Sequence, residues 1–130
     1  MLKIILTLLL AFVSNSVMAE LNDCSRGGTI LAQCAANWER LRQDNFAMRS
    51  TDDAWYIASF QGFIDGVMSQ TFKKAWCIND RTSTDQFYAV VSKYLRDNPE
   101  KWNKQSADLV LISIGKAFPC NHPTNTKEKP

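Results

Sequence analysis

The sequence predicts an all-α protein, a small disulfide-stapled bundle of about four main helices. Four segments carry apolar side chains at three- and four-residue spacing, which is typical of helices with one buried face. Four cysteines, an even number, follow an N-terminus of the exported type and favour disulfides. A buried strand is the alternative for the apolar run LVLISI, but no partner strand is evident elsewhere.

The first 19 residues have the pattern of a secretory signal peptide. Lys3 precedes an apolar run over residues 4–13, and the small-residue sequence Val-Met-Ala ends at Ala19. The apolar run is about half the length of a membrane-spanning helix, which needs roughly 20 residues. We expect cleavage after Ala19 and a periplasmic location in a Gram-negative bacterium. A signal-anchor that stays attached is the alternative.

Residues 20–120 form one domain, which is marginal for a purely hydrophobic core. The polar ending NHPTNTKEKP, residues 121–130, is expected to be a solvated tail. The cysteines form no C-x-x-C pair, and the only histidine, His122, lies in the tail, so we expect no metal, no cofactor and no Cys-His nucleophile. Without Lys3, the chain has 14 of its 15 basic side chains and 13 acidic ones, a balance that argues against binding to nucleic acid or to an anionic membrane. We therefore expect neither nucleic-acid partners nor membrane insertion after signal cleavage.

Local signals place the helices at 29–43, 52–72, 84–97 and 106–118. The first ends in a basic turn, the second begins after the cap residue Ser50, and Pro99 and Pro119 follow the last two. The sequence QDNFAMRS between the first two helices is expected to be a loop. The fourth helix is apolar on nearly every side and is predicted to be central.

The sequence FQGFIDGVM in the second helix contains two glycines four residues apart. Glycine costs about 1 kcal/mol relative to alanine inside a helix, so Gly62 and Gly66 need a reason. They share a face with Ala58, and Asp65 lies at its edge. We predict that this face is buried against another helix of the chain, with a dimer seam as the alternative. Asp65 is predicted to be a buried, hydrogen-bonded carboxylate rather than a catalytic acid, because no second reactive group lies at a compatible spacing.

Four tryptophans divide into two groups. Trp38, Trp55 and Trp76 are predicted to lie in the core or at its edge. Trp102 lies in the sequence EKWNK after a helix-ending proline, where it either projects as an exposed interface anchor or folds back onto the third helix.

Three motifs together carry a family resemblance. They are G-x-x-D-G in YIASFQGFIDGVM, a cysteine before TSTDQFYAVVSKYLRDNPE, and a terminal A-F-P-C in ADLVLISIGKAFPC. Their order and spacing over residues 56–120 resemble the Rap/Tai immunity proteins that accompany type VI secretion amidase effectors. The N-terminal third matches only through L-x-x-C at Leu31 to Cys34.

The resemblance implies a disulfide between Cys77 and Cys120. Family members often carry a further cysteine six residues before the G-x-x-D-G motif, where this chain has Tyr56. The chain has an additional cysteine at Cys24 instead. Pairing of Cys24 with Cys34 is then what remains, although the resemblance supplies no partner for Cys34.

The resemblance also implies a function: a non-enzymatic periplasmic protein, often a homodimer, that occludes the active site of a peptidoglycan amidase. Cleft-blocking elements usually lie on loops, and two loops qualify. The predicted effector contacts are Asn79, Asp80, Arg81, Thr82 and Ser83 in the first loop, and Trp102 and Lys104 in the second. The alternative is that Arg81 only decorates a solvated turn. A periplasmic chaperone is the competing class, and it would need a large exposed apolar patch.

Overall fold

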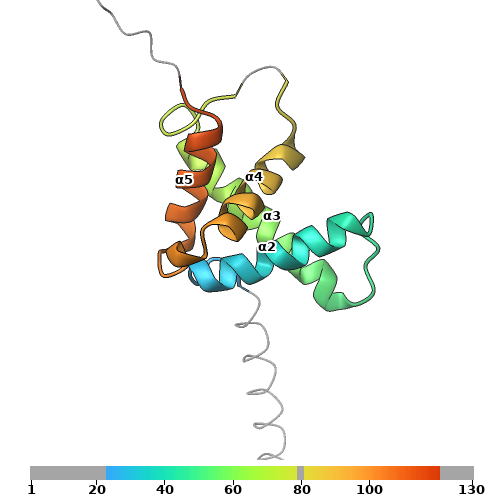
Figure 1. The fold of residues 1–130 in the computed structure, drawn as a ribbon. Coiled ribbons are helices and arrows are strands. Elements are labelled where there is room, and N and C mark those ends of the chain that lie inside the picture. The colour runs from blue at the N-terminus through green and yellow to red at the C-terminus, as the bar shows by residue number, and fades with distance from the viewer. Residues whose placement is uncertain (1–22, 79–80, 121–130) are drawn as a thin grey trace, which may run out of the picture.

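Four α-helices build the part of the chain that the structure describes, residues 23–78 and 81–120 of a computed structural model (Figure 1). They are α2 (Gly28–Gln43), α3 (Thr51–Thr71), α4 (Thr84–Asp97) and α5 (Ser106–Ala117), with a short 3₁₀ helix η1 (Pro99–Lys101) after α4. Every predicted helix boundary lies within one residue of the observed one, and the all-α prediction is confirmed. The predicted signal peptide and C-terminal tail lie outside the described residues.

The core is centred on Trp38, which is fully buried in α2. Its ring lies 5.6 Å from the ring of Phe60 on α3 and 5.9 Å from that of Tyr88 on α4, measured between centroids. Both ring pairs are tilted or edge-on, the arrangements that aromatic quadrupoles favour. A single side chain therefore joins three helices, and α2, like α5, contacts each of the other three.

A second aromatic cluster closes the end of the bundle where α3 and α5 finish. Trp76, Phe87 and Phe118 stack edge-on, with centroid separations of 5.4 Å and 5.0 Å. Trp76 also donates a hydrogen bond from Nε1 to Thr71 Oγ1 at 3.0 Å. Residues 72–78, the described part of the connection that follows α3, are thereby packed onto the bundle.

The loop between α2 and α3 is organised by one buried carboxylate, Asp53. Its Oδ2 accepts the backbone N–H of Arg49 at 2.9 Å, and its Oδ1 pairs with Arg40 at 2.8 Å. The hydrogen bond from Arg49, followed by that from Arg40, holds the pKa of Asp53 below its ordinary value. Ser50 caps α3 by accepting the N–H of Asp53, as its sequence position predicts.

One prediction about burial is wrong. Trp55 is 52% exposed, because it lies on the outward face of α3. The fourth helix, α5, contacts each of the other three helices, as its predicted central place requires, although Leu111 and Ile112 are only partly buried.

Candidate functional site

The connection from α3 to α4 is tied to the end of the chain by a disulfide. Cys77 and Cys120 are bonded, with their Cα atoms 4.9 Å apart, and the N–H of Cys77 donates to the carbonyl of Phe118 at 2.9 Å. The pairing implied by the family resemblance is confirmed. Ile78, which precedes the predicted contact loop, therefore directly follows a residue that is fixed by the disulfide.

The far end of that loop is fixed by the start of α4. Ser83 is the N-cap residue, and its N–H donates to Gln86 Oε1 at 2.8 Å, as in a capping box. Arg81 is exposed and Thr82 is partly exposed. The other two predicted contacts, Asn79 and Asp80, lie outside the described residues. The loop is thus anchored on both sides, by a disulfide before it and by a helix cap after it.

A hollow of about 350 Å³ lies beside this loop, between the end of α3 and the start of α4. We call it the α3–α4 hollow; it is lined by Asp65, Met68, Ser69, Phe72, Trp76, Ile78, Thr84 and Phe87. Phe72 and Ile78 are 37% and 52% exposed, unusually open for large apolar side chains. The sequence reasoning missed this site, because Ile78 lies in a connection and follows no helical period.

Asp65 lies at the hollow and is exposed, so the prediction that it is buried is wrong. The prediction that it is hydrogen-bonded is confirmed: the Tyr88 hydroxyl donates to the carboxylate, 2.9 Å from Oδ1 and 3.0 Å from Oδ2. Burial, together with the hydrogen bond to Asp65 and its charge, raises the pKa of Tyr88. Tyr88 therefore remains a neutral donor that holds the carboxylate in place.

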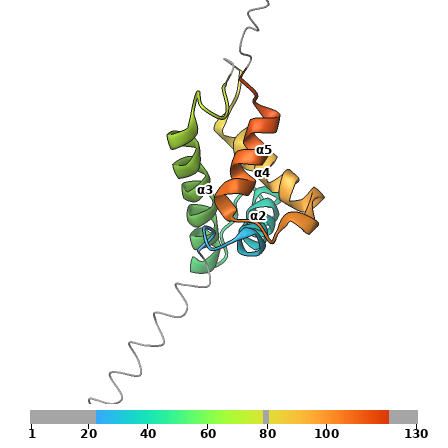
Figure 2. The same ribbon diagram turned by 90° about the vertical axis from the view of Figure 1, so that its left-hand side faces the viewer.

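Gly62 and Gly66 face outward, so the predicted helix contact within the chain is wrong. A Cβ atom built on either glycine would meet nothing within 4 Å. Figure 2 shows α3 along one edge of the bundle, and it packs inward through Phe60 and Ile64 instead. A shallow groove of about 340 Å³ runs along the outward face, lined by Gly62, Phe63, Gly66, Val67, Gln70 and Thr71.

The glycine that permits close packing is Gly28, at the first turn of α2. Its Cβ would lie 2.5 Å from the carbonyl oxygen of Trp102 and 2.6 Å from Leu109 Cδ1. The N–H of Gly28 also donates to the carbonyl of Lys104 at 2.9 Å. The start of α2 therefore touches the backbone of the segment between α4 and α5, and sequence reasoning did not single out this contact.

The second predicted contact loop is held against the bundle. Trp102 is half-buried and donates from Nε1 to the carbonyl of Leu95 at 2.8 Å, which confirms that it folds back onto α4. The Lys104 side chain is exposed. This loop follows α4 and the first loop precedes it, and a helix of 14 residues is about 20 Å long. The two predicted contact loops therefore lie at opposite ends of α4.

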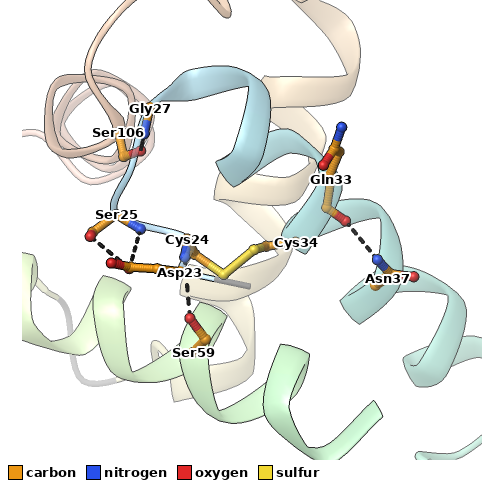
Figure 3. The surroundings of a disulfide bond; sticks show 9 residues. All are labelled: Asp23, Cys24, Ser25, Gly27, Gln33, Cys34, Asn37, Ser59 and Ser106. Atoms are coloured by element: carbon orange, nitrogen blue, oxygen red, sulfur yellow. Dashed lines mark hydrogen bonds between the residues drawn. A yellow bond between two sulfur atoms is a disulfide. The ribbon is translucent and has the colours of Figure 1, made fainter. Parts of the chain in front are cut away.

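The other disulfide joins Cys24 to Cys34, with Cα atoms 6.0 Å apart (Figure 3). Both cysteines are fully buried. The N–H of Cys24 donates to Ser59 Oγ on α3 at 3.2 Å, and that of Gly27 donates to Ser106 Oγ on α5 at 2.9 Å. The additional cysteine of this chain thus fixes the segment before α2 to the bundle.

Residues 23–78 and 81–120 contain neither a metal-binding cluster nor a membrane-spanning helix. Within these ranges, no group of three or more His, Cys, Asp or Glu side chains is placed to hold a metal ion. Of the helices described, none is both long and apolar enough to cross a membrane.

These features define a small helical protein that is held together by two disulfides and has an anchored loop beside an open apolar hollow. Residues 26–120 match the family model of the Rap1a immunity proteins, which covers most of the chain. The protein belongs to this family. It has no significant match among curated proteins or among solved structures.

Proposed function

We propose that the protein is a periplasmic immunity protein that binds and inhibits a peptidoglycan amidase delivered by a type VI secretion system. Membership of the Rap1a immunity family carries the proposal, since such a protein binds a secreted effector. Two disulfides support an oxidising compartment. In this proposal the signal peptide is removed after Ala19, residues 20–120 form the binding domain, and residues 121–130 are a tail.

The protein inhibits by occupying the amidase cleft and performs no chemistry itself. The loop of residues 79–83 is the element best placed to enter a cleft, because the Cys77–Cys120 disulfide and the Ser83 cap fix its two ends. A loop anchored in this way loses less conformational entropy on binding than a free one. Arg81, which is exposed, and Thr82, which is partly exposed, place polar side chains in the described part of this loop.

Substituting Arg81 with alanine should weaken binding to the amidase by about tenfold or more, as truncation of a central interface arginine often does. Trp102→Ala tests the second predicted contact loop, and because Trp102 lies at the other end of α4 it should weaken binding less than Arg81→Ala does. Isothermal titration with a catalytically inactive peptidoglycan amidase effector would measure both dissociation constants. Circular dichroism checks folding, and a peptidoglycan cleavage assay with the active amidase measures inhibition.

Each outcome of this experiment is informative. A wild-type protein that neither binds nor inhibits the amidase would refute the proposed function. If Trp102→Ala weakens binding and Arg81→Ala does not, the contact surface includes Trp102 and Lys104 rather than the first loop.

We also propose that the protein forms a homodimer through the outward face of α3. Gly62 and Gly66 leave space at the backbone, and Trp55 lies on the same face seven residues before Gly62. Small residues at such spacing allow two helices to approach more closely than the usual 8–10 Å. The proteins that this chain resembles are often homodimers, which supports a dimer.

Gly62→Leu should raise the dissociation constant of this dimer by about tenfold or more, because a leucine fills the space that the partner helix needs. The folded monomer should persist, since nothing in the chain lies within 4 Å of the position. Gln33→Leu, on an exposed position of α2, is the control. Sedimentation equilibrium measures the dimer dissociation constant of wild type, Gly62→Leu and Gln33→Leu. A wild-type monomer, or a Gly62→Leu dimer of unchanged affinity, would exclude this interface.

A further inference from the structure

We infer that the α3–α4 hollow is an anchor site of the effector interface, which receives an apolar side chain of the effector next to a lysine or arginine that pairs with Asp65. This inference rests on the proposed function and adds to it the chemistry of the partner surface.

The hollow is apolar and already formed. Met68, Trp76 and Phe87 are largely buried in its wall, while Phe72 and Ile78 remain open to solvent. The Phe72 and Trp76 rings lie 4.9 Å apart, and the N–H of Lys73 donates to the carbonyl of Trp76 at 2.9 Å. A partner therefore finds exposed apolar surface whose burial is favourable, and little ordering cost opposes binding.

The negative charge of Asp65 at the hollow favours a cationic side chain of the partner. The Asp65 carboxylate is held by the neutral Tyr88 hydroxyl, and none of the ion pairs among the described residues includes it. The α3 sequence itself contains no lysine or arginine. Lys73, just beyond the helix, lies over the Phe72 ring, with Nζ 5.6 Å from its centroid. A lysine or arginine of the partner would form a charge-assisted hydrogen bond with a carboxylate whose position is already fixed.

The position of the hollow connects it to the proposed contact loop. Ile78 directly precedes the loop, Thr84 directly follows it, and both line the hollow. A protein that covers Arg81 must therefore also approach the hollow. The loop would enter the amidase cleft while the rim of that cleft places its apolar and cationic side chains in the α3–α4 hollow.

Two substitutions with matched controls test this inference. Ile78→Ala and Asp65→Asn should each raise the dissociation constant for the inactive amidase by about tenfold. Met48→Ala removes an equally exposed apolar side chain outside the hollow, and Asp108→Asn removes an exposed carboxylate of α5; both should bind within about twofold of wild type. Asp65→Asn should also reduce the salt dependence of binding, because it removes one ion pair. Thermal melts verify that each variant is folded.

The outcomes separate this inference from the proposed function. If wild type binds and inhibits the amidase, and Ile78→Ala and Asp65→Asn bind like wild type, the hollow is no anchor site and the proposed function stands. If Ile78→Ala loses affinity and Asp65→Asn does not, the partner places no lysine or arginine against Asp65. Failure of wild type to bind or inhibit would refute the proposed function itself.

Discussion

The variant Cys77→Ala/Cys120→Ala should lose about 4 kcal/mol of unfolding free energy. The bond joins residues 43 apart, and the chain-entropy estimate for closing a loop of that length gives roughly this value. Urea denaturation of the non-reduced variant and wild type, monitored by circular dichroism, measures the difference in unfolding free energy. Cys24→Ala/Cys34→Ala is the comparison. The bond that it removes joins residues 10 apart, and the same estimate gives a loss of about 3 kcal/mol. Because both sulfur atoms are buried, the loss of their packing lowers the unfolding free energy further.

The same variant should also bind the amidase more weakly than its stability loss explains. Without the bond, the segment before the contact loop loses its covalent anchor, and ordering it on binding costs entropy. The measurement is affinity at a temperature where the variant is still fully folded. A variant that unfolds at the same urea concentration as wild type would show that the aromatic cluster, not the disulfide, holds this end of the bundle.

Gly28→Ala should destabilise the protein by about 3 kcal/mol, near the upper end for overpacking a tight contact. The added methyl group would meet the carbonyl oxygens of Trp102 and Lys104 at 2.5 and 2.9 Å, and backbone atoms cannot move aside as a flexible side chain can. Shifting the two segments apart would also stretch the hydrogen bond from Gly28 to Lys104. Urea denaturation again provides the measurement.

Gly62→Ala is the control for Gly28→Ala, and it should raise the free energy of unfolding where Gly28→Ala lowers it. Its methyl group meets nothing within 4 Å, so the helix gains about 1 kcal/mol from the better propensity of alanine. If the two substitutions changed stability equally, the contact between Gly28 and the segment after α4 would not exist as described.

The helices could be predicted from sequence because their signals are local. Ser50 and Pro99 mark helix boundaries through backbone chemistry that depends on a few neighbouring residues. Helical periodicity then identifies which side chains share a face. The all-α class and the four helix ranges depend only on such local information.

The burial of α3 could not be predicted in the same way, because periodicity does not show what covers a face. Gly62 and Phe60 lie on different faces of one helix, and only the packing of the other helices decides which face is inside. The predicted burial of Trp55 is wrong for the same reason. The α3–α4 hollow depends on Ile78 in a connection without a period, so only the folded chain brings it next to Asp65.

The two ends of the described chain leave the bundle at opposite ends, as Figures 1 and 2 both show. Cys120 is bonded to the residue just before Ile78, so any domain or affinity tag fused after Cys120 starts beside the α3–α4 hollow. A fusion ahead of Cys24 starts instead near Ser59, six residues before Asp65 and so about 9 Å along α3 from the hollow. The Cys77–Cys120 bond thus makes the N-terminal side the safer attachment point for a reporter, an immobilisation tag or a tether to another protein.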